Sequence, residues 1–142
     1  MTERQAEAVW NGPLKDGSGV IKLGSGAYEG PFSWASRFED APGTNPEELL
    51  GAAHAGCYSM ALSSNLGKAG FTPQHIHTRA VVTIERVDGQ NRITHILLDS
   101  EARVAGISEK QFQAIAEQVK LSCPISAALA SVPVTLIARR LT

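Results

Sequence analysis

The most specific sequence features of the chain lie between residues 44 and 57, which read Thr44-Asn45-Pro46-Glu47-Glu48-Leu49-Leu50-Gly51-Ala52-Ala53-His54-Ala55-Gly56-Cys57. Asn45 can cap a helix, Pro46 suits its first position, and Glu48 completes a capping box. The small apolar residues that follow predict a helix that continues to about Lys68. We expect this helix to be central and closely packed, and it carries one of the two cysteines in the chain.

Length and composition indicate a soluble globular protein. The 142 residues suffice for one domain with its own core, so we expect a single domain over residues 1–142. A net charge of −1 gives no reason to expect nucleic acid or an anionic membrane as a partner. The polar start of the sequence is unlike a signal segment, and no apolar run reaches the roughly 18 residues of a membrane span. We therefore expect a cytoplasmic protein.

The first forty residues predict a small N-terminal β-meander. Alternating or β-branched residues indicate strands over residues 4–10, 20–23 and 31–34, and Gly and Pro turns separate them. This glycine and proline content favours a flexible arm or a cover rather than a part of the core. Residues 35–43 are expected to form a loop, in which Arg37 could simply be a solvated charge.

The second half of the chain predicts strands and helices around the central helix. Residues 75–87 and 93–104 are rich in β-branched residues and are joined by a hairpin turn. A second helix opens at Ser108, a short helix follows over residues 124–130, and residues 134–139 form a last strand. The sequence therefore predicts an α+β fold with a long central helix and an antiparallel sheet.

The histidines are expected to be structural or exposed. His75 and His77 share one side of a strand at a spacing that metal sites use, but no acidic residue or cysteine joins them in the sequence. We expect these two and His95 to be surface residues. His54 lies one turn before Cys57, but residues three apart on a helix point alongside each other, which favours a structural role. Three other large side chains are expected in the core or a pocket wall: Tyr58, Met60 and Phe71.

The two cysteines lie too far apart in the sequence for a CxxC redox motif or a zinc knuckle, so only the fold can bring them together. A buried free cysteine is often no more than a small hydrophobic residue. Cys123 precedes Pro124 and so lies at or beside the N-cap of the short helix, where free N–H groups favour a thiolate. Cys57 lies too deep in its helix for the dipole to act on it. A thiolate there needs a separate cation, and the nearest basic residues in the sequence are Arg37 and Lys68.

Three motifs together resemble the OsmC/Ohr family of hydroperoxide reductases. They are residues 45–57, Gly70-Phe71-Thr72-Pro73 and Cys123-Pro124-Ile125-Ser126, and the resemblance extends from about Ala8 to Leu136. The run Trp34-x-x-Arg37-Phe38-Glu39 and the continuous Gly-Ala-Ala-His-Ala-x-Cys at residues 51–57 resemble the OsmC branch more than the Ohr branch.

The resemblance implies an OsmC-like fold in an intertwined homodimer. It also implies a thiol peroxidase that reduces organic hydroperoxides, and hydrogen peroxide less well, without a metal, haem or other cofactor. In this family pattern Cys57 matches the peroxide-attacking cysteine and Cys123 the resolving cysteine. Arg37 matches the arginine that activates the thiolate, and Glu47 the glutamate that orients it. The implied reductant is a dithiol, typically a dihydrolipoyl group on a carrier protein.

Helix geometry adds that the active site is composite. Glu47 and Cys57 are ten residues apart, which places them about 15 Å apart along a straight helix. One guanidinium cannot contact both, so we expect Arg37 and Glu47 of one subunit to serve the cysteines of the other. Glu39 and Glu48 remain alternatives to Glu47 as the partner of the arginine.

Two other functions are compatible with this layout. A thiol redox sensor or stress-response binding protein would oxidise once and signal without turnover. A purely structural or ligand-binding protein would use Cys57 for packing alone. Catalytic consumption of peroxide distinguishes the enzyme from both.

Overall fold

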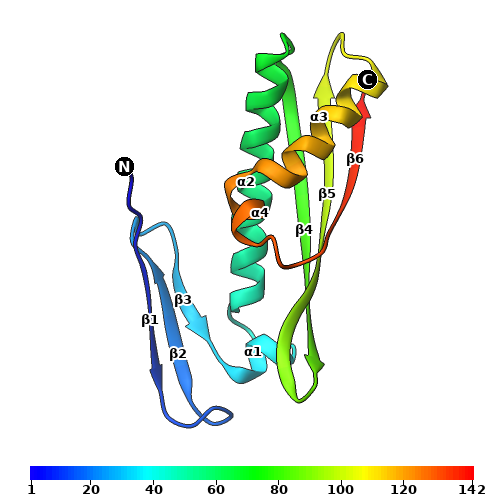
Figure 1. Ribbon diagram of the computed structural model, residues 1–142. Coiled ribbons are helices and arrows are strands. Elements are labelled where there is room, and N and C mark those ends of the chain that lie inside the picture. Colours follow the sequence, from blue (N-terminus) through cyan, green and yellow to red (C-terminus); the bar gives the residue numbers. More distant parts are fainter. The chain divides into compact units, whose positions relative to one another are not determined.

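The structure, a computed structural model, describes residues 1–142 and contains two compact units, residues 1–49 and residues 50–142. Both helices and strands are present, so the predicted α+β class is confirmed (Figure 1). Helix α2 (Pro46–Lys68) begins in the first unit and continues in the second.

The first unit is a β-meander, as predicted, followed by a helix that was not predicted. Its antiparallel strands are β1 (Ala6–Asn11), β2 (Ser18–Leu23) and β3 (Glu29–Phe32). Residues expected to end a strand and begin a loop instead form helix α1 (Trp34–Phe38). Ser33 and Ser36 cap this helix by exchanging hydrogen bonds between side chain and backbone. Because a serine stands where a capping box usually has Glu or Gln, the start signal is easily missed.

The start of α2 agrees with the predicted cap. The side chain of Asn45 accepts the backbone N–H of Glu48 at 2.8 Å. The Glu48 carboxylate does not return to the cap backbone, however, but accepts the Thr44 hydroxyl at 2.8 Å. At the other end the chain turns through Gly70, whose φ of +93° favours glycine, and α2 stops near the predicted residue.

The second unit contains a three-stranded sheet in the order β4-β5-β6. Its elements are β4 (Pro73–Val87), β5 (Gln90–Val104), α3 (Glu109–Ser122), α4 (Pro124–Ala128) and β6 (Val134–Leu141). β4 and β5 are antiparallel, whereas β6 runs parallel to β5, so the prediction of an antiparallel sheet is wrong for this pair. The reason is the connection: α3 and α4 carry the chain back to the end of the sheet at which β5 begins.

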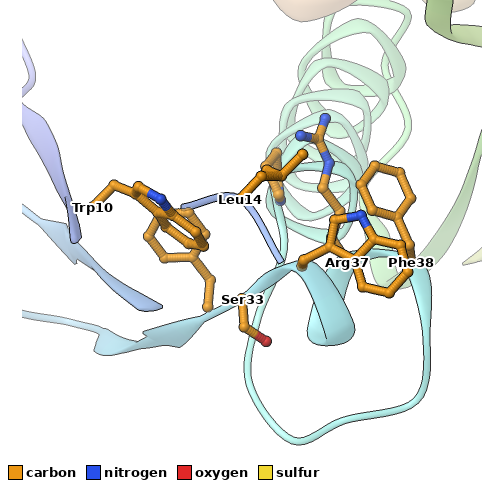
Figure 2. A pocket seen from close by; sticks show the side chains of 8 residues that line it. Trp10, Leu14, Ser33, Arg37 and Phe38 are labelled. Carbon is orange, nitrogen blue, oxygen red and sulfur yellow. The ribbon is translucent and has the colours of Figure 1, made fainter. Parts of the chain in front are cut away.

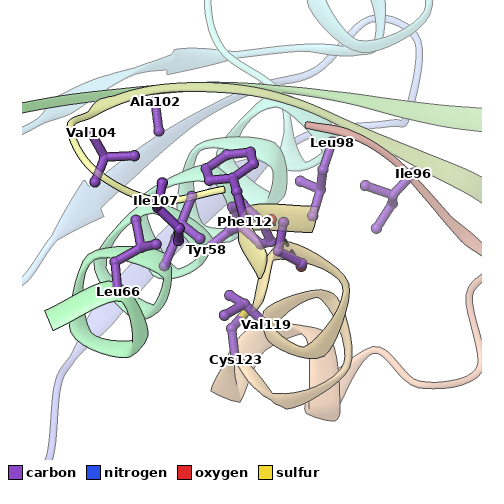
Figure 3. Packing of buried hydrophobic residues seen from close by; sticks show 12 residues of the cluster. Tyr58, Leu66, Ile96, Leu98, Ala102, Val104, Ile107, Phe112, Val119 and Cys123 are labelled. Atoms are coloured by element: carbon purple, nitrogen blue, oxygen red, sulfur yellow. Dashed lines mark hydrogen bonds between the residues drawn. The ribbon is translucent and has the colours of Figure 1, made fainter. Parts of the chain in front are cut away.

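The hydrophobic core of the second unit lies between the sheet and helices α2 and α3 (Figure 3). Alternate residues of β5 point into it, and α2 and α3 contribute one apolar stripe each. The fully buried large side chains include Tyr58, Leu62, Leu66, Ile96, Leu98 and Phe112. The opposite face of the sheet is charged, with Asp99 bound by Arg79 and Arg139. Exposed His75 and His77 also lie on the solvent side, as predicted.

One face of α2 is less packed than predicted. A Cβ added at Gly51 would lie 3.4 Å from a methyl group of Val82, which is the expected close neighbour. Gly56 and Gly67 have no such neighbour within 4 Å. Met60, expected in the core or a pocket wall, is 77% exposed and lines a pocket with residues at the start of β4, so it belongs to a pocket wall and not to the core. The two glycines therefore lie where no other element packs closely against the helix, which the evenly small and apolar sequence of α2 does not reveal.

Two leucines provide a test of where the core lies. Leu62 is fully buried, whereas Leu121 on α3 is 73% exposed. We expect Leu62→Ala to lower the free energy of unfolding by about 2–5 kcal/mol, because it removes buried methyl groups and leaves a cavity. Leu121→Ala should change it by no more than about 0.5 kcal/mol. Urea unfolding at one protein concentration measures both, and equal losses would contradict this placement of the core.

Candidate active site

Arg37 and Glu47 form an ion pair at the junction of α1 and α2. The Arg37 Nε donates to the Glu47 Oε1 at 2.7 Å. Two hydrogen bonds hold the junction: the Ser36 hydroxyl donates to the Thr44 carbonyl at 2.8 Å, and the Asn45 amide donates to the Ser36 carbonyl at 3.3 Å. The Glu47 side chain is 9% exposed and its second oxygen has no partner, whereas the Arg37 side chain is 37% exposed. The buried carboxylate therefore fixes an arginine whose guanidinium remains accessible.

A mostly apolar pocket of about 230 Å³ opens beside Arg37. Figure 2 shows Trp10, Leu14 and Phe38 around it, with the arginine on its wall. The guanidinium also lies 5.2 Å from the centroid of the Phe38 ring, a cation–π contact. An accessible cation beside an apolar pocket suits a ligand with one polar, electron-rich end and one hydrocarbon end.

The sulfur atoms of both cysteines lie at the first turn of α4. Cys123 is the N-cap of this helix, as predicted, and its Sγ accepts the N–H of Ser126 at 3.4 Å. The Sγ of Cys57, from the middle of α2, accepts the N–H of Ile125, also at 3.4 Å. The two thiols are free and are neighbours, each accepting a backbone N–H from the first turn of α4. The fold thus brings together two cysteines whose proximity the sequence spacing could not show.

The protonation of Cys57 depends on opposing influences. Burial raises the pKa of its thiol, the N–H of Ile125 lowers it, and the neighbouring Cys123 raises it, so the net effect is a pKa above the ordinary value. The Ile125 N–H compensates for only part of the desolvation. A reactive thiolate at Cys57 therefore needs a further positive charge.

His54 is fully buried on α2, which agrees with its predicted structural placement. Its Nε2 lies 2.7 Å from the Ser126 Oγ, and its Nδ1 has no partner. The Ser126 Oγ is in turn 3.1 Å from the Cys123 Sγ. Burial lowers the pKa of His54, so its imidazole is neutral at pH 7. Ser126 was missed as a site residue, although its position three residues after a capping cysteine is a signal that could have found it.

The structure brings the four predicted site residues together as two pairs, Arg37 with Glu47 and Cys57 with Cys123. Of the three acidic residues considered for the arginine, Glu47 is the one that binds it. Their catalytic roles stay predictions. No group of three or more His, Cys, Asp or Glu side chains is placed to hold a metal ion. None of the helices is long and apolar enough to cross a membrane.

Comparison with known proteins agrees with the motifs. The model of the OsmC family, described as OsmC-like protein, matches residues 38–137. Over 127 residues the chain is 46% identical to the Escherichia coli protein named Peroxiredoxin OsmC, and the match covers 89% of each chain. The Shigella flexneri protein of the same name matches equally well.

Solved structures show the same fold at low sequence identity. An OsmC-like protein from Mycoplasma pneumoniae is 16% identical with a TM-score of 0.77, and 99% of each chain is covered. The organic hydroperoxide resistance protein OhrB of Bacillus subtilis is 20% identical with a TM-score of 0.71, and the match covers 94% of this chain and 97% of that one. The predicted OsmC-like fold is confirmed, and this chain belongs to the OsmC family, within its OsmC branch.

Proposed function

We propose that the protein is a peroxiredoxin-like thiol peroxidase that reduces organic hydroperoxides, and hydrogen peroxide less well, to alcohols or water. The observation that carries the proposal is the placement of two free, adjacent thiols at the first turn of α4. The relative named Peroxiredoxin OsmC supports the same activity. No cofactor takes part, and the protein serves in oxidative and osmotic stress defence in the cytoplasm.

In the first step the Cys57 thiolate attacks the terminal oxygen of the hydroperoxide. A bond forms between sulfur and oxygen, the O–O bond breaks, and the alkoxide leaves and takes up a proton to become an alcohol. The peroxide is reduced, and Cys57 is oxidised to a sulfenic acid. The guanidinium of Arg37, held by Glu47, stabilises both the thiolate and the leaving oxygen.

In the second step the sulfur of Cys123 attacks the Cys57 sulfenic acid. The new S–S bond replaces the S–O bond, and water leaves. A dithiol then restores both cysteines by two exchange reactions and becomes a disulfide itself. The proposed dithiol is a dihydrolipoyl group on a carrier protein, as the family resemblance implies.

The apolar pocket beside Arg37 supports organic rather than hydrogen peroxide as the preferred substrate. Its aromatic and aliphatic lining gains free energy by covering an alkyl or aryl group, at about 25 cal/mol for each Å² removed from water. Hydrogen peroxide has no such group.

The proposed assembly is an intertwined homodimer of single OsmC-like domains with composite sites. Glu47 and Cys57 are ten residues apart on the continuous helix α2, about 15 Å along its axis. Arg37 is bound to Glu47 by its Nε. In the dimer, Arg37 and Glu47 of one subunit serve Cys57 and Cys123 of the other. The exposed Gly56 on α2 would allow a second subunit to approach closely.

Turnover separates the enzyme from a redox sensor. With cumene hydroperoxide and excess dihydrolipoamide, the wild-type protein should consume many equivalents of peroxide per subunit. Cys57→Ser should show only the background rate, because the nucleophile is gone. Cys123→Ser should turn over more slowly than the wild type, because only the added dithiol can then reduce the sulfenic acid. A single equivalent consumed by the wild type would favour the sensor, and equal turnover by all three proteins would contradict the mechanism.

Mixed dimers test the composite site. Differently tagged Arg37→Ala and Cys57→Ser chains, each inactive as a homodimer, are coexpressed, and the dimer carrying both tags is isolated. One of its two sites then has every wild-type residue, so we expect about half of the wild-type activity. An inactive mixed dimer alongside an active wild type would show that each site takes all its residues from one chain.

A further inference from the structure

His54 is a buried ionisable group that the proposed mechanism does not use. It is fully enclosed on α2, and its only polar contact is the 2.7 Å hydrogen bond between its Nε2 and the Ser126 Oγ. The other nitrogen, Nδ1, is buried without a partner. A side chain that served only to fill space would not bury a polar atom unpaired, because this costs about 1–3 kcal/mol. We therefore expect the hydrogen bond with Ser126 to be the reason that this position holds a histidine.

The contact continues from Ser126 to Cys123. The serine oxygen lies 3.1 Å from the Cys123 Sγ, so His54, Ser126 and Cys123 form one chain of hydrogen bonds between α2 and the start of α4. The serine hydroxyl has one proton to donate. When Cys123 is a thiol, its S–H donates to the serine, and the serine donates to the Nε2 of His54.

The direction of this chain assigns the tautomer of the histidine. Its Nε2 has the free electron pair facing Ser126, and its Nδ1 carries the hydrogen. Burial favours the neutral ring by lowering the pKa of His54, so this electron pair is available at neutral pH. A neutral imidazole that receives a hydroxyl proton is the arrangement that activates a nucleophile through that hydroxyl.

We propose that Ser126 is a catalytic residue of the disulfide-forming step and that His54 is its positioning residue and proton store. This inference rests on the proposed function, since it concerns the resolution of the Cys57 sulfenic acid. The proposal is independent of Arg37, which acts on the peroxide step alone.

The step balances as follows in atoms and electrons. As the Cys123 sulfur bonds to the Cys57 sulfur, its proton passes to Ser126, and the serine proton passes to His54. The S–O bond of Cys57 breaks with its electron pair, and hydroxide leaves. The proton stored on His54 returns through Ser126 and converts hydroxide to water. The sulfur of Cys57 is reduced, that of Cys123 is oxidised, and no other reactant is needed.

Single-turnover kinetics test the proposal, because they separate the two steps. The first rate is the loss of cumene hydroperoxide. The second is the conversion of the sulfenic acid to the disulfide, which is measured by trapping the sulfenic acid with dimedone and recording the mass of the intact protein. His54→Gln retains a hydrogen-bond partner for Ser126 but cannot take up the proton, and Ser126→Ala breaks the chain. We expect both variants to keep the first rate within about twofold and to lose about 100-fold or more of the second.

Matched variants exclude a purely structural explanation. Ser126→Thr restores the hydroxyl and should recover the second rate to within a few-fold. Ser59→Ala removes a different hydroxyl, which lies on α2 and bonds Thr78 instead of a cysteine, and this variant should change neither rate. The proposal is overturned if Ser126→Ala and His54→Gln form the disulfide at the wild-type rate. It is also overturned if these variants slow both steps equally and lower the midpoint temperature of thermal unfolding, because that result indicates a loss of structure. A wild-type protein that forms no sulfenic acid would instead refute the proposed function.

Discussion

The free energy of placing a negative charge on Cys57 governs the rest of the site. The thiol is half-buried against the core, and burial disfavours its thiolate. Within residues 50–142 the one favourable influence on the thiolate is the N–H of Ile125. A fully exposed thiol would ionise more easily but would also be open to every oxidant and thiol in solution. The structure instead protects the sulfur and leaves its ionisation to an added cation.

The need to stabilise a negative charge on Cys57 explains the positions of the neighbouring elements. Helix α4 begins with Pro124, and the amides of Ile125 and Ser126, which have no carbonyl partner in the first turn of the helix, are directed at the two sulfurs. Helix α1 and the hydrogen bonds around Ser36 set Arg37 on the buried Glu47. The carboxylate limits the motion of the arginine while its guanidinium stays accessible. In the proposed dimer these two arrangements meet, and neither is complete alone.

Local signals were the part of the fold that the sequence predicted well. The cap at Asn45, the strands of the hairpin and the position of Cys123 before Pro124 depend on residues a few positions apart, and the structure agrees with each. Helix α1 was missed because a serine pair caps it without the usual acidic residue. The parallel pairing of β6 depends on where a long connection returns, which no local pattern records.

The sequence predicted which residues belong to the site but not the contacts that they make. Family motifs identified the two cysteines, Arg37 and Glu47, and the structure brings these together in pairs. The hydrogen bond between His54 and Ser126 joins residues 72 positions apart, and the Ile125 amide is a backbone group with no sequence signature. Such contacts arise from tertiary packing, so a sequence motif can identify the thiols without revealing how their protons are controlled.

The pH dependence of Cys57 alkylation most directly tests whether Arg37 supplies the missing charge. In a Cys123→Ser background only Cys57 reacts with iodoacetamide, and the rate follows its thiolate fraction. With Arg37 present, the midpoint of the pH profile should lie below that of free cysteine. In the Arg37→Ala protein, burial should move the midpoint above that of free cysteine, because desolvation raises the pKa of Cys57. Identical midpoints in the two proteins would contradict activation by Arg37.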